Sequence, residues 1–321
     1  MLSKSLNIIG HNSHQYEVVK GWGDLIPDTH PVADCHEMVI DKSGRIFLLT
    51  NETRNNILIY NNSGKFIGSW GHKYPGGHGL SIANENGEEF MFITDIIRHQ
   101  VIKTTLKGRE IMVLNYPDEI EAYRSAEVFN PTETAIAPNG DIYVTDGYGL
   151  QFVIQYDCFG NYIRHWGGLG QAADKFDCAH GITIDSRNPS SPTLLITSRN
   201  HNAFKRFSMD GYYLGSISLP GSFICRPVIK DKFLYAAVFR SGTNTNFGSG
   251  YITILDENDK VISTPGGSEP EYINGVLQTQ YQDNAIFIHP HDVCIDEDDN
   301  IIVCQWKSEQ TYPIKLNKII L

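Results

Sequence analysis

The phrase HGLSIA at residues 78–83 decides the fold of this chain, because close copies of it return along the sequence. The copies read HEMVID at 36–41, HGITID at 180–185 and HDVCID at 291–296, and TETAIA at 132–137 keeps the frame without the histidine. In each copy an apolar stretch follows the first residues. A unit that recurs every roughly 40–50 residues is typical of propellers and solenoids.

Each unit continues with the same internal pattern. A turn follows the phrase, as in KSG at 42–44 or PNG at 138–140, and a β-branched and aromatic strand comes next, as in IFLL at 46–49 or IYV at 142–144. A polar loop leads to a third strand, and a second turn leads to a fourth strand that ends near Trp70 or Trp166. Short strands with turns at this spacing predict four-stranded blades.

We therefore predict an all-β fold, a six-bladed β-propeller that forms a single domain over residues 1–321. The sixth unit has no clear fourth strand, and we expect QYEVV at 15–19 to supply it and close the ring. Closure of this kind removes exposed sheet edges. The six blades are expected to begin near His36, His78, Thr132, His180, Arg226 and His291.

Net charge and cysteine content indicate which partners and which cellular compartment to expect. The net charge of −11 disfavours nucleic acid and anionic membranes as partners. We expect no signal peptide and no membrane span, because no apolar run is long enough for either. The six cysteines are scattered without a CxxC pair, which favours a reducing, cytoplasmic compartment. A small-molecule substrate is the expected partner, and the oligomeric state stays open.

The repeated histidine predicts a metal site. Residues at equivalent positions of blades arranged around an axis converge on one point, and convergent imidazoles are what a divalent metal needs. A single such histidine would favour packing at the channel wall, but His78, His180 and His291 share one frame and together favour metal binding. His36 is in the same register. Three roles stay open for it: a fourth metal ligand, a contact to metal-bound substrate, or a hydrogen-bond donor to one of the metal ligands. Glu37 and Glu133 lie beside this frame and either face the channel or pair with neighbours.

The order of several longer phrases resembles the NHL-repeat propellers. These phrases are GHGLSI at 77–82, NPTE at 130–133, VTDGY at 144–148, His180 with Arg199, and PHD at 290–292. In particular the chain resembles, over nearly its whole length, the catalytic domain of peptidyl-α-hydroxyglycine α-amidating lyase, also called peptidylamidoglycolate lyase.

The resemblance implies a set of site residues. It implies a catalytic zinc on His78, His180 and His291, and a structural calcium on the carbonyl oxygens of Met38 and Leu80 and the carboxylate of Asp292. It also implies Tyr148 as the base and Arg199 as an arginine of the substrate pocket. The family's first-blade arginine matches Asn51 here, and Arg240 lies where it could replace that arginine from another blade. His36 and His289 are additional histidines that we assign to substrate binding.

These residues predict a metal-dependent, lyase-like enzyme that acts on a small polar hydroxylated substrate at the central channel. By resemblance, Tyr148 takes a proton from a substrate hydroxyl, a carbon–heteroatom bond breaks as a carbonyl forms, and Arg199 holds an anionic group. Because Asn51 departs from the family pattern, a metal-dependent eliminase or hydrolase of a sugar derivative is an alternative. A non-enzymatic NHL-repeat scaffold that binds protein is the rival class.

Overall fold

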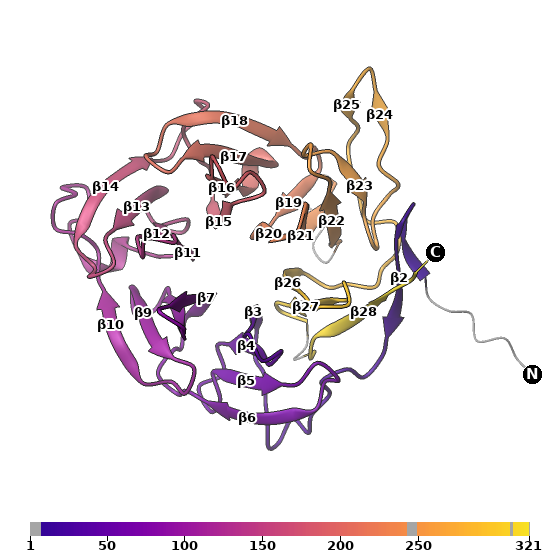
Figure 1. Ribbon diagram of the computed structural model, residues 1–321, viewed down its shortest axis with the longest axis horizontal. Helices are drawn as coiled ribbons and strands as arrows, with labels where there is room; N and C mark the ends of the chain where they lie inside the picture. Colours follow the sequence, from indigo (N-terminus) through magenta and orange to yellow (C-terminus); the bar gives the residue numbers. More distant parts are fainter. Residues whose placement is uncertain (1–7, 243–248, 309–310, 321) are drawn as a thin grey trace, which may run out of the picture.

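The computed structural model describes residues 8–242, 249–308 and 311–320, in which six antiparallel sheets are arranged around a central axis (Figure 1). The predicted all-β, six-bladed propeller is confirmed. The described helices are two short 3₁₀ turns, η1 (Ala126–Val128) and η2 (Arg199–His201). Along the described part of the chain, no helix has the length and apolar character to cross a membrane.

Four blades each contain four consecutive strands. Blade 1 has β3 (Cys35–Ile40), β4 (Ile46–Thr50), β5 (Ile57–Tyr60) and β6 (Phe66–Trp70). Blade 2 has β7 (Gly77–Glu85), β8 (Glu88–Asp95), β9 (Gln100–Thr105) and β10 (Glu110–Leu114). Blade 3 has β11 (Glu133–Ile136), β12 (Ile142–Thr145), β13 (Phe152–Tyr156) and β14 (Tyr162–Gly167). Blade 4 has β15 (Ala179–Asp185), β16 (Thr193–Ser198), β17 (Ala203–Ser208) and β18 (Tyr213–Ser218).

Blades 5 and 6 depart from this plan. In blade 5 the innermost strand is split into β19 (Ser222–Ile224) and β20 (Val228–Lys230), which both pair with β21 (Phe233–Ser241). The strands β22 (Tyr251–Leu255) and β23 (Val261–Ser263) complete that blade. The interruption falls at Pro227, which has no backbone N–H to give to a strand pairing.

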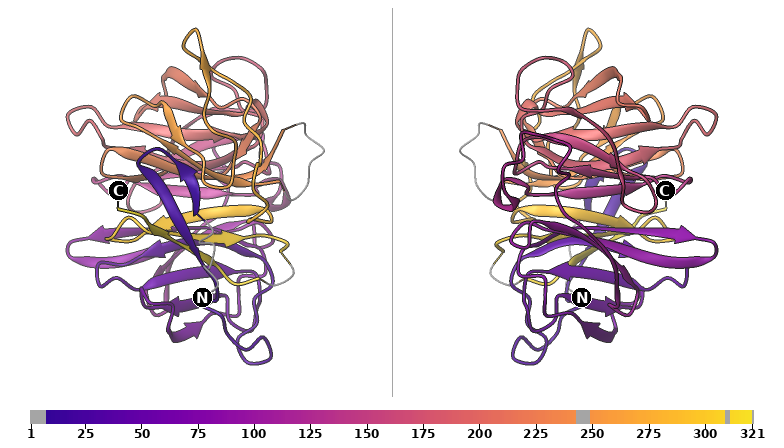
Figure 2. Two further views of the ribbon diagram at one scale, coloured as in Figure 1. Left: turned by 90° about the vertical axis from the view of Figure 1, so that its right-hand side faces the viewer. Right: turned by 90° about the vertical axis from the view of Figure 1, so that its left-hand side faces the viewer.

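Blade 6 is closed by the N-terminal part of the described chain, as predicted. Its inner strands are β26 (Pro290–Ile295), β27 (Ile301–Gln305) and β28 (Ile314–Lys318), and β2 (His14–Val19) pairs with β28. A further strand that the sequence did not predict, β1 (Ile8–His11), pairs outside β2. The small hairpin of β24 (Tyr272–Ile273) and β25 (Val276–Leu277), also not predicted, projects from the ring in Figures 1 and 2.

Six apolar clusters hold the ring together, one between each pair of neighbouring blades. Strand β4 shows how the sequence achieves this: Ile46 and Leu48 pack toward blade 6, whereas Phe47 and Leu49 pack toward blade 2. Successive side chains of a strand point to opposite faces, so a strand that is buried on both faces reads as a continuous apolar run. The runs that predicted second strands therefore mark sheets covered on both sides.

The closing strand should contribute strongly to stability. Tyr16 of β2 is fully buried in the cluster between blades 5 and 6. We expect Tyr16→Ala to lower the free energy of unfolding by about 3–5 kcal/mol, because truncating a large buried aromatic leaves a cavity. Chemical denaturation measures this change. Tyr212→Ala is the matched control, since Tyr212 is 73% exposed on an outer turn and should change stability by less than about 0.5 kcal/mol. Equal effects of the two changes would show that β2 does not close the ring.

Candidate functional site

The four histidines of the repeated phrase each lie at a β-bulge of an innermost strand. The pairing register shifts between Cys35 and Glu37 around His36, and it shifts in the same way around His78, His180 and His291. A bulge interrupts the alternation of side chains and re-aims one of them. Each phrase therefore turns its histidine out of the regular strand pattern and toward its equivalents.

The four imidazole rings meet as one cluster. The centroid of the His78 ring lies 5.0 Å from that of His36, 4.8 Å from that of His180 and 5.1 Å from that of His291. The His291 ring lies 5.0 Å from the His36 ring and 4.9 Å from the His180 ring. Thus the structure brings together the three predicted zinc ligands. It adds His36, whose ring lies as close to His78 and His291 as the other rings lie to one another.

The ligand atoms form two overlapping groups that could hold a metal ion. One atom each from His36, His78 and His291 lie within 4.8 Å of one another, and so do atoms of His180, Cys225 and His291. All five side chains are buried. The predicted set of His78, His180 and His291 is thus divided between these two groups, which share His291 and add the His36 imidazole to one and the Cys225 thiol to the other.

Hydrogen bonds fix the chemical form of two of these rings. The Nδ1 atom of His78 is 2.9 Å from the carbonyl oxygen of Thr132, and the Nδ1 atom of His291 is 2.9 Å from that of His36. A carbonyl can only accept, so Nδ1 carries the proton and Nε2 keeps its lone pair when the ring is neutral. This is the arrangement that orients a histidine as a metal ligand.

The other rings also fit a bound cation. Neither ring nitrogen of the buried His180 has a hydrogen-bond partner among the described residues, and the same holds for Nδ1 of His36. Burial, together with the nearby Arg199 cation, lowers the pKa of His36 to about 3. The pKa values of His78, His180 and His291 are also held well below their usual range, first by burial and then by neighbouring imidazole and guanidinium groups. Neutral imidazoles with available lone pairs suit a divalent transition metal.

Tyr148 and Arg199 lie beside the histidines, where the sequence predicted them. The Tyr148 hydroxyl oxygen is 3.3 Å from Nε2 of His78 and 3.4 Å from Nη1 of Arg199. Tyr148 is 42% exposed, so this is the side of the cluster that solvent and a substrate can reach. Burial of the hydroxyl end raises the pKa of Tyr148, and the Arg199 cation opposes that rise.

The loop that carries Tyr148 is held by Asp146. Its carboxylate accepts hydrogen bonds from the backbone N–H groups of Asn130 and Leu150 and from the Tyr123 hydroxyl, at 2.7, 2.6 and 2.6 Å. Three donors on one buried carboxylate leave the loop little freedom. Asp146 thus holds the turn that carries Tyr148.

Arg199 is a buried cation without an acidic partner. Its Nε donates to the carbonyl oxygen of Ile224 at 3.1 Å, and its Nη2 donates to Sγ of Cys225 at 3.0 Å. The guanidinium carbon lies 5.1 Å from the centre of the Phe239 ring. Among the described residues no carboxylate forms an ion pair with Arg199, which is only 7% exposed. Buried charges are usually paired, so this cation is available to an anionic ligand.

The remaining predicted substrate contacts are farther out. Asn51 exchanges hydrogen bonds with Asp34, to whose carboxylate it donates at 3.1 Å, and neither residue contacts the histidines. The Arg240 guanidinium lies over the Phe223 ring at 4.4 Å. The His289 ring stacks on Phe239 with centroids 4.8 Å apart, so it borders the site through that phenyl ring.

The prediction of calcium does not fit the structure. The carbonyl oxygens of Met38 and Leu80 and the carboxylate of Asp292 do converge, but on the guanidinium of Arg226. These oxygens accept its N–H groups at 3.0, 2.9 and 2.6 Å. A second cation at the same point would meet like charge at contact distance, so these residues do not fit a calcium ion while Arg226 is in place.

Cys225 is the site residue that the sequence analysis missed. The expected start of blade 5 puts Arg226 in the histidine frame, but it is the Cys225 sulfur that lies with His180 and His291. The frame of blade 5 is therefore shifted by one residue: Cys225 matches the histidines, and Arg226 matches the residue that follows them. Comparing Arg226 with Glu37 and Asp292, two charged residues directly after a histidine, would have given this frame.

A cavity of about 970 Å³ lies farther along the axis. It is lined by the later residues of the innermost strands of all six blades, among them Ile40, Ile136 and Ile295, and by Arg226. The histidines begin these strands and do not line it. Arg226 thus lies between the histidine cluster and this cavity.

Comparisons with known proteins agree with the resemblance seen in the sequence. No protein-family model matches the chain. The chain is 24% identical to peptidyl-alpha-hydroxyglycine alpha-amidating lyase 1 of Drosophila melanogaster over 285 residues, which are 80% of this chain and 47% of that protein. It is 27% identical to NHL repeat-containing protein 3 of Homo sapiens over 170 residues, which are 50% of this chain and 47% of that protein. The chain thus resembles NHL-repeat and amidating-lyase proteins and spans about half the length of these relatives.

Solved structures support the fold alone. A streptogramin B lyase superposes with a TM-score of 0.60 at 15% identity, covering 90% of this chain and 95% of the other. A gluconolactonase of Xanthomonas campestris superposes with a TM-score of 0.65 at 10% identity, covering 97% of this chain and 94% of the other. Both likenesses extend over almost the whole ring.

The donor set makes metal binding measurable. We expect the purified chain to bind a divalent transition metal, and His180→Ala to weaken that binding by more than the roughly 10–100-fold that loss of an outer hydrogen-bond partner costs. The propeller should stay folded, because the apolar clusters hold the blades independently of the histidines. Competition with a chromogenic chelator measures the affinity, and circular dichroism checks the fold.

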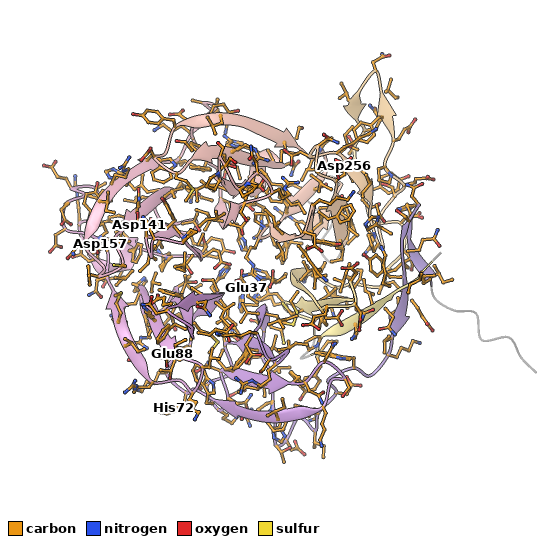
Figure 3. All side chains as sticks on the ribbon, in the orientation of Figure 1. Glu37, His72, Glu88, Asp141, Asp157 and Asp256 are labelled. Carbon is orange, nitrogen blue, oxygen red and sulfur yellow. The ribbon has the colours of Figure 1, made fainter. Side chains whose placement is uncertain are left out.

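The control for this change is His72→Ala, since His72 is exposed at the rim of the ring (Figure 3). It should leave metal affinity unchanged. His36→Ala reports whether the fourth imidazole is a ligand. Unchanged metal content and affinity in His180→Ala would refute the assignment.

Proposed function

We propose that this chain is a metal-dependent lyase that acts on a small hydroxylated substrate carrying a carboxylate or another anionic group. The observation that carries the proposal is the buried Arg199 guanidinium, which pairs with no acidic side chain that the structure describes. It lies 3.4 Å from the hydroxyl oxygen of Tyr148 and next to four convergent imidazoles. An anion on Arg199 would place the rest of a small molecule between Tyr148 and the histidines.

The proposed metal is zinc, held by His78, His180 and His291, with His36 and Cys225 as further candidate ligands. Three neutral imidazoles and an open position are a common catalytic zinc site. When bound, zinc acidifies a coordinated hydroxyl group and polarises a developing carbonyl. The Nδ1 bonds of His78 and His291 fix the tautomers that this role requires.

The residues of the chain supply the proton transfer and the binding. In this proposal Tyr148 takes the proton of the substrate hydroxyl, and the same proton then passes to the departing nitrogen or oxygen. The bond between the carbinol carbon and that heteroatom breaks with its electron pair on the leaving group, and a carbonyl forms. Because burial raises the pKa of Tyr148, Arg199 has a second task, which is to favour the tyrosinate.

The named relatives supply a specific version of this chemistry. The similarity to amidating lyases favours an α-hydroxyglycine substrate, which would release glyoxylate. One observation favours the alternative, elimination or hydrolysis on a sugar derivative. Asn51 is engaged with Asp34 and the neighbouring Arg54 pairs with Glu52 at the surface, so blade 1 gives the site no second arginine.

An assay with an α-hydroxyglycine substrate separates these activities. We expect glyoxylate release, detected colorimetrically, that requires added or bound zinc. Stoichiometric metal without glyoxylate release would favour the sugar-derivative activity. Absence of both metal and turnover would instead support the protein-binding scaffold.

Two substitutions test the assigned roles. We expect Tyr148→Phe to keep the metal and lower kcat by roughly 10²–10⁴-fold, because only the proton acceptor is removed. We expect Arg199→Met to raise KM by roughly 10–100-fold, the cost of a charge-assisted contact, and to move the alkaline pKa of the kcat/KM profile upward. The profile should rise with pH, since the tyrosinate is the active form and its pKa is raised.

The control is Arg164→Met, because Arg164 pairs with Asp210 on the outer surface, away from the histidines. Its kinetics should match those of the unaltered chain. If Arg199→Met has unaltered KM and an unaltered pH profile, Arg199 does not hold the substrate.

A further inference from the structure

Arg226 lies on the axis of the propeller and is 9% exposed. Its Nη1 donates to the carbonyl oxygen of Leu80 at 2.9 Å, and its Nη2 donates to that of Met38 at 3.0 Å. Nη2 and Nε also hold both carboxylate oxygens of Asp292, at 2.6 and 3.2 Å. One side chain from blade 5 thus binds the innermost strands of blades 1, 2 and 6.

Two more buried carboxylates face the same guanidinium. An oxygen of Glu37 lies 3.6 Å from Nη1, and an oxygen of Glu133 lies 3.6 Å from Nε. Both glutamates are fully buried, and Figure 3 shows Glu37 near the centre of the ring. Glu37 Oε1 and Glu133 Oε2 have no hydrogen-bond partner among the described residues.

The remaining blade approaches the backbone of the same residue. A Cβ atom added to Gly181 of blade 4 would lie 2.6 Å from Cα of Arg226, so only glycine fits there. With Glu133 from blade 3, every blade therefore touches Arg226. Glycine in the phrase HGITID is explained by this close approach.

Three carboxylates and two carbonyl oxygens around one point are the donor set that a hard divalent cation such as calcium takes. Here that point holds a guanidinium, whose planar fork of N–H groups matches carboxylate and carbonyl acceptors. A calcium ion would need the same oxygens, and displacing Arg226 would leave a buried positive charge without partners. The two cations exclude each other.

We propose that Arg226 is a covalently attached substitute for a structural divalent cation. This chain needs no calcium to hold its six innermost strands together. Removing the side chain opens a calcium site formed by Glu37, Glu133, Asp292 and the carbonyl oxygens of Met38 and Leu80. Arg226 lies beyond the histidines along the axis, and its role does not depend on the proposed function.

The unaltered chain provides the first test. We expect its Tm, measured on metal-free protein, to be the same within about 1 °C with and without millimolar calcium chloride. A calcium-dependent rise of about 5 °C or more would overturn the proposal, because it would mean that calcium binds the native channel. Magnesium chloride at equal concentration controls for ionic strength.

The second test is Arg226→Ala. Without calcium its Tm should fall by about 5 °C or more, since removing one partner of a buried ion pair leaves uncompensated charge. Calcium should then raise the Tm in proportion to the logarithm of its concentration, and isothermal titration should find one ion per chain. A folded variant that neither binds calcium nor gains stability from it would overturn the proposal.

Two controls make the result specific. Arg187→Ala also removes an arginine, a partly buried one that pairs with Asp185 and Asp259 outside the channel while Arg206 keeps contact with both. It should lose stability and gain nothing from calcium. Adding Asp292→Asn to Arg226→Ala should abolish the calcium response, whereas an undiminished response would place the ion elsewhere.

If Arg226→Ala does not fold without calcium, the variant is refolded from denaturant in calcium and, separately, in magnesium. Recovery of folded protein in calcium but not in magnesium supports the proposal. If the variant refolds in neither salt, terbium luminescence measures whether the unaltered chain binds a calcium-like ion. An absence of binding there supports occupation of the site by Arg226, and stoichiometric terbium displaced by calcium overturns it.

Discussion

The packing of every blade against two neighbours is the interaction on which the rest of this structure depends. Six apolar clusters alternate with six sheets, so the inner strands such as β4 and β12 must bury both of their faces, whereas outermost strands such as β6 and β18 stay partly exposed. That requirement makes the blades stand side by side around an axis and gives their innermost strands equivalent places. A residue that recurs in the sequence then recurs around a point in space, which is why one short phrase can build a site.

Successive positions of the phrase produce two environments of opposite character. The bulged histidines and Cys225 form a layer of nitrogen and sulfur donors, beside Arg199, which has no carboxylate partner within the described parts of the chain. The following positions supply Glu37, Glu133 and Asp292, a layer of oxygen atoms that surrounds a guanidinium. Softer donors suit transition metals and oxygen donors suit hard cations, so the change of donor within one or two residues separates the two kinds of chemistry along the axis.

The sequence was sufficient for the fold and for the convergence of the repeated histidines, because both depend on repetition. Apolar runs, turns and the histidine frame are local, and they located the blades, the closing strand and the residues that meet around the axis. The predictions that were wrong or incomplete concerned contacts between segments that are distant in the sequence. The frame of blade 5 slipped by one residue because Pro227 splits its inner strand, and Arg226 could be recognised as the axial cation only once Met38, Leu80 and Asp292 were seen around it. Asn51 was assigned by position alone, although its amide is engaged with Asp34. Strand β1 and the strands of the β24–β25 hairpin are too short for an alternating apolar pattern to be recognised in the sequence.

Closure by β2 also sets the order of events when the chain is made. Tyr16 pairs with Lys318, so the two strands of this contact are about 300 residues apart. At a synthesis rate of about 5–20 residues per second, the first strand waits roughly 15–60 s for its partner. During that time its apolar face and its strand edge are open to other chains, and the ring gains its last interface only at the end. Nascent protein is therefore at greatest risk of aggregation while five blades are complete and the sixth is not.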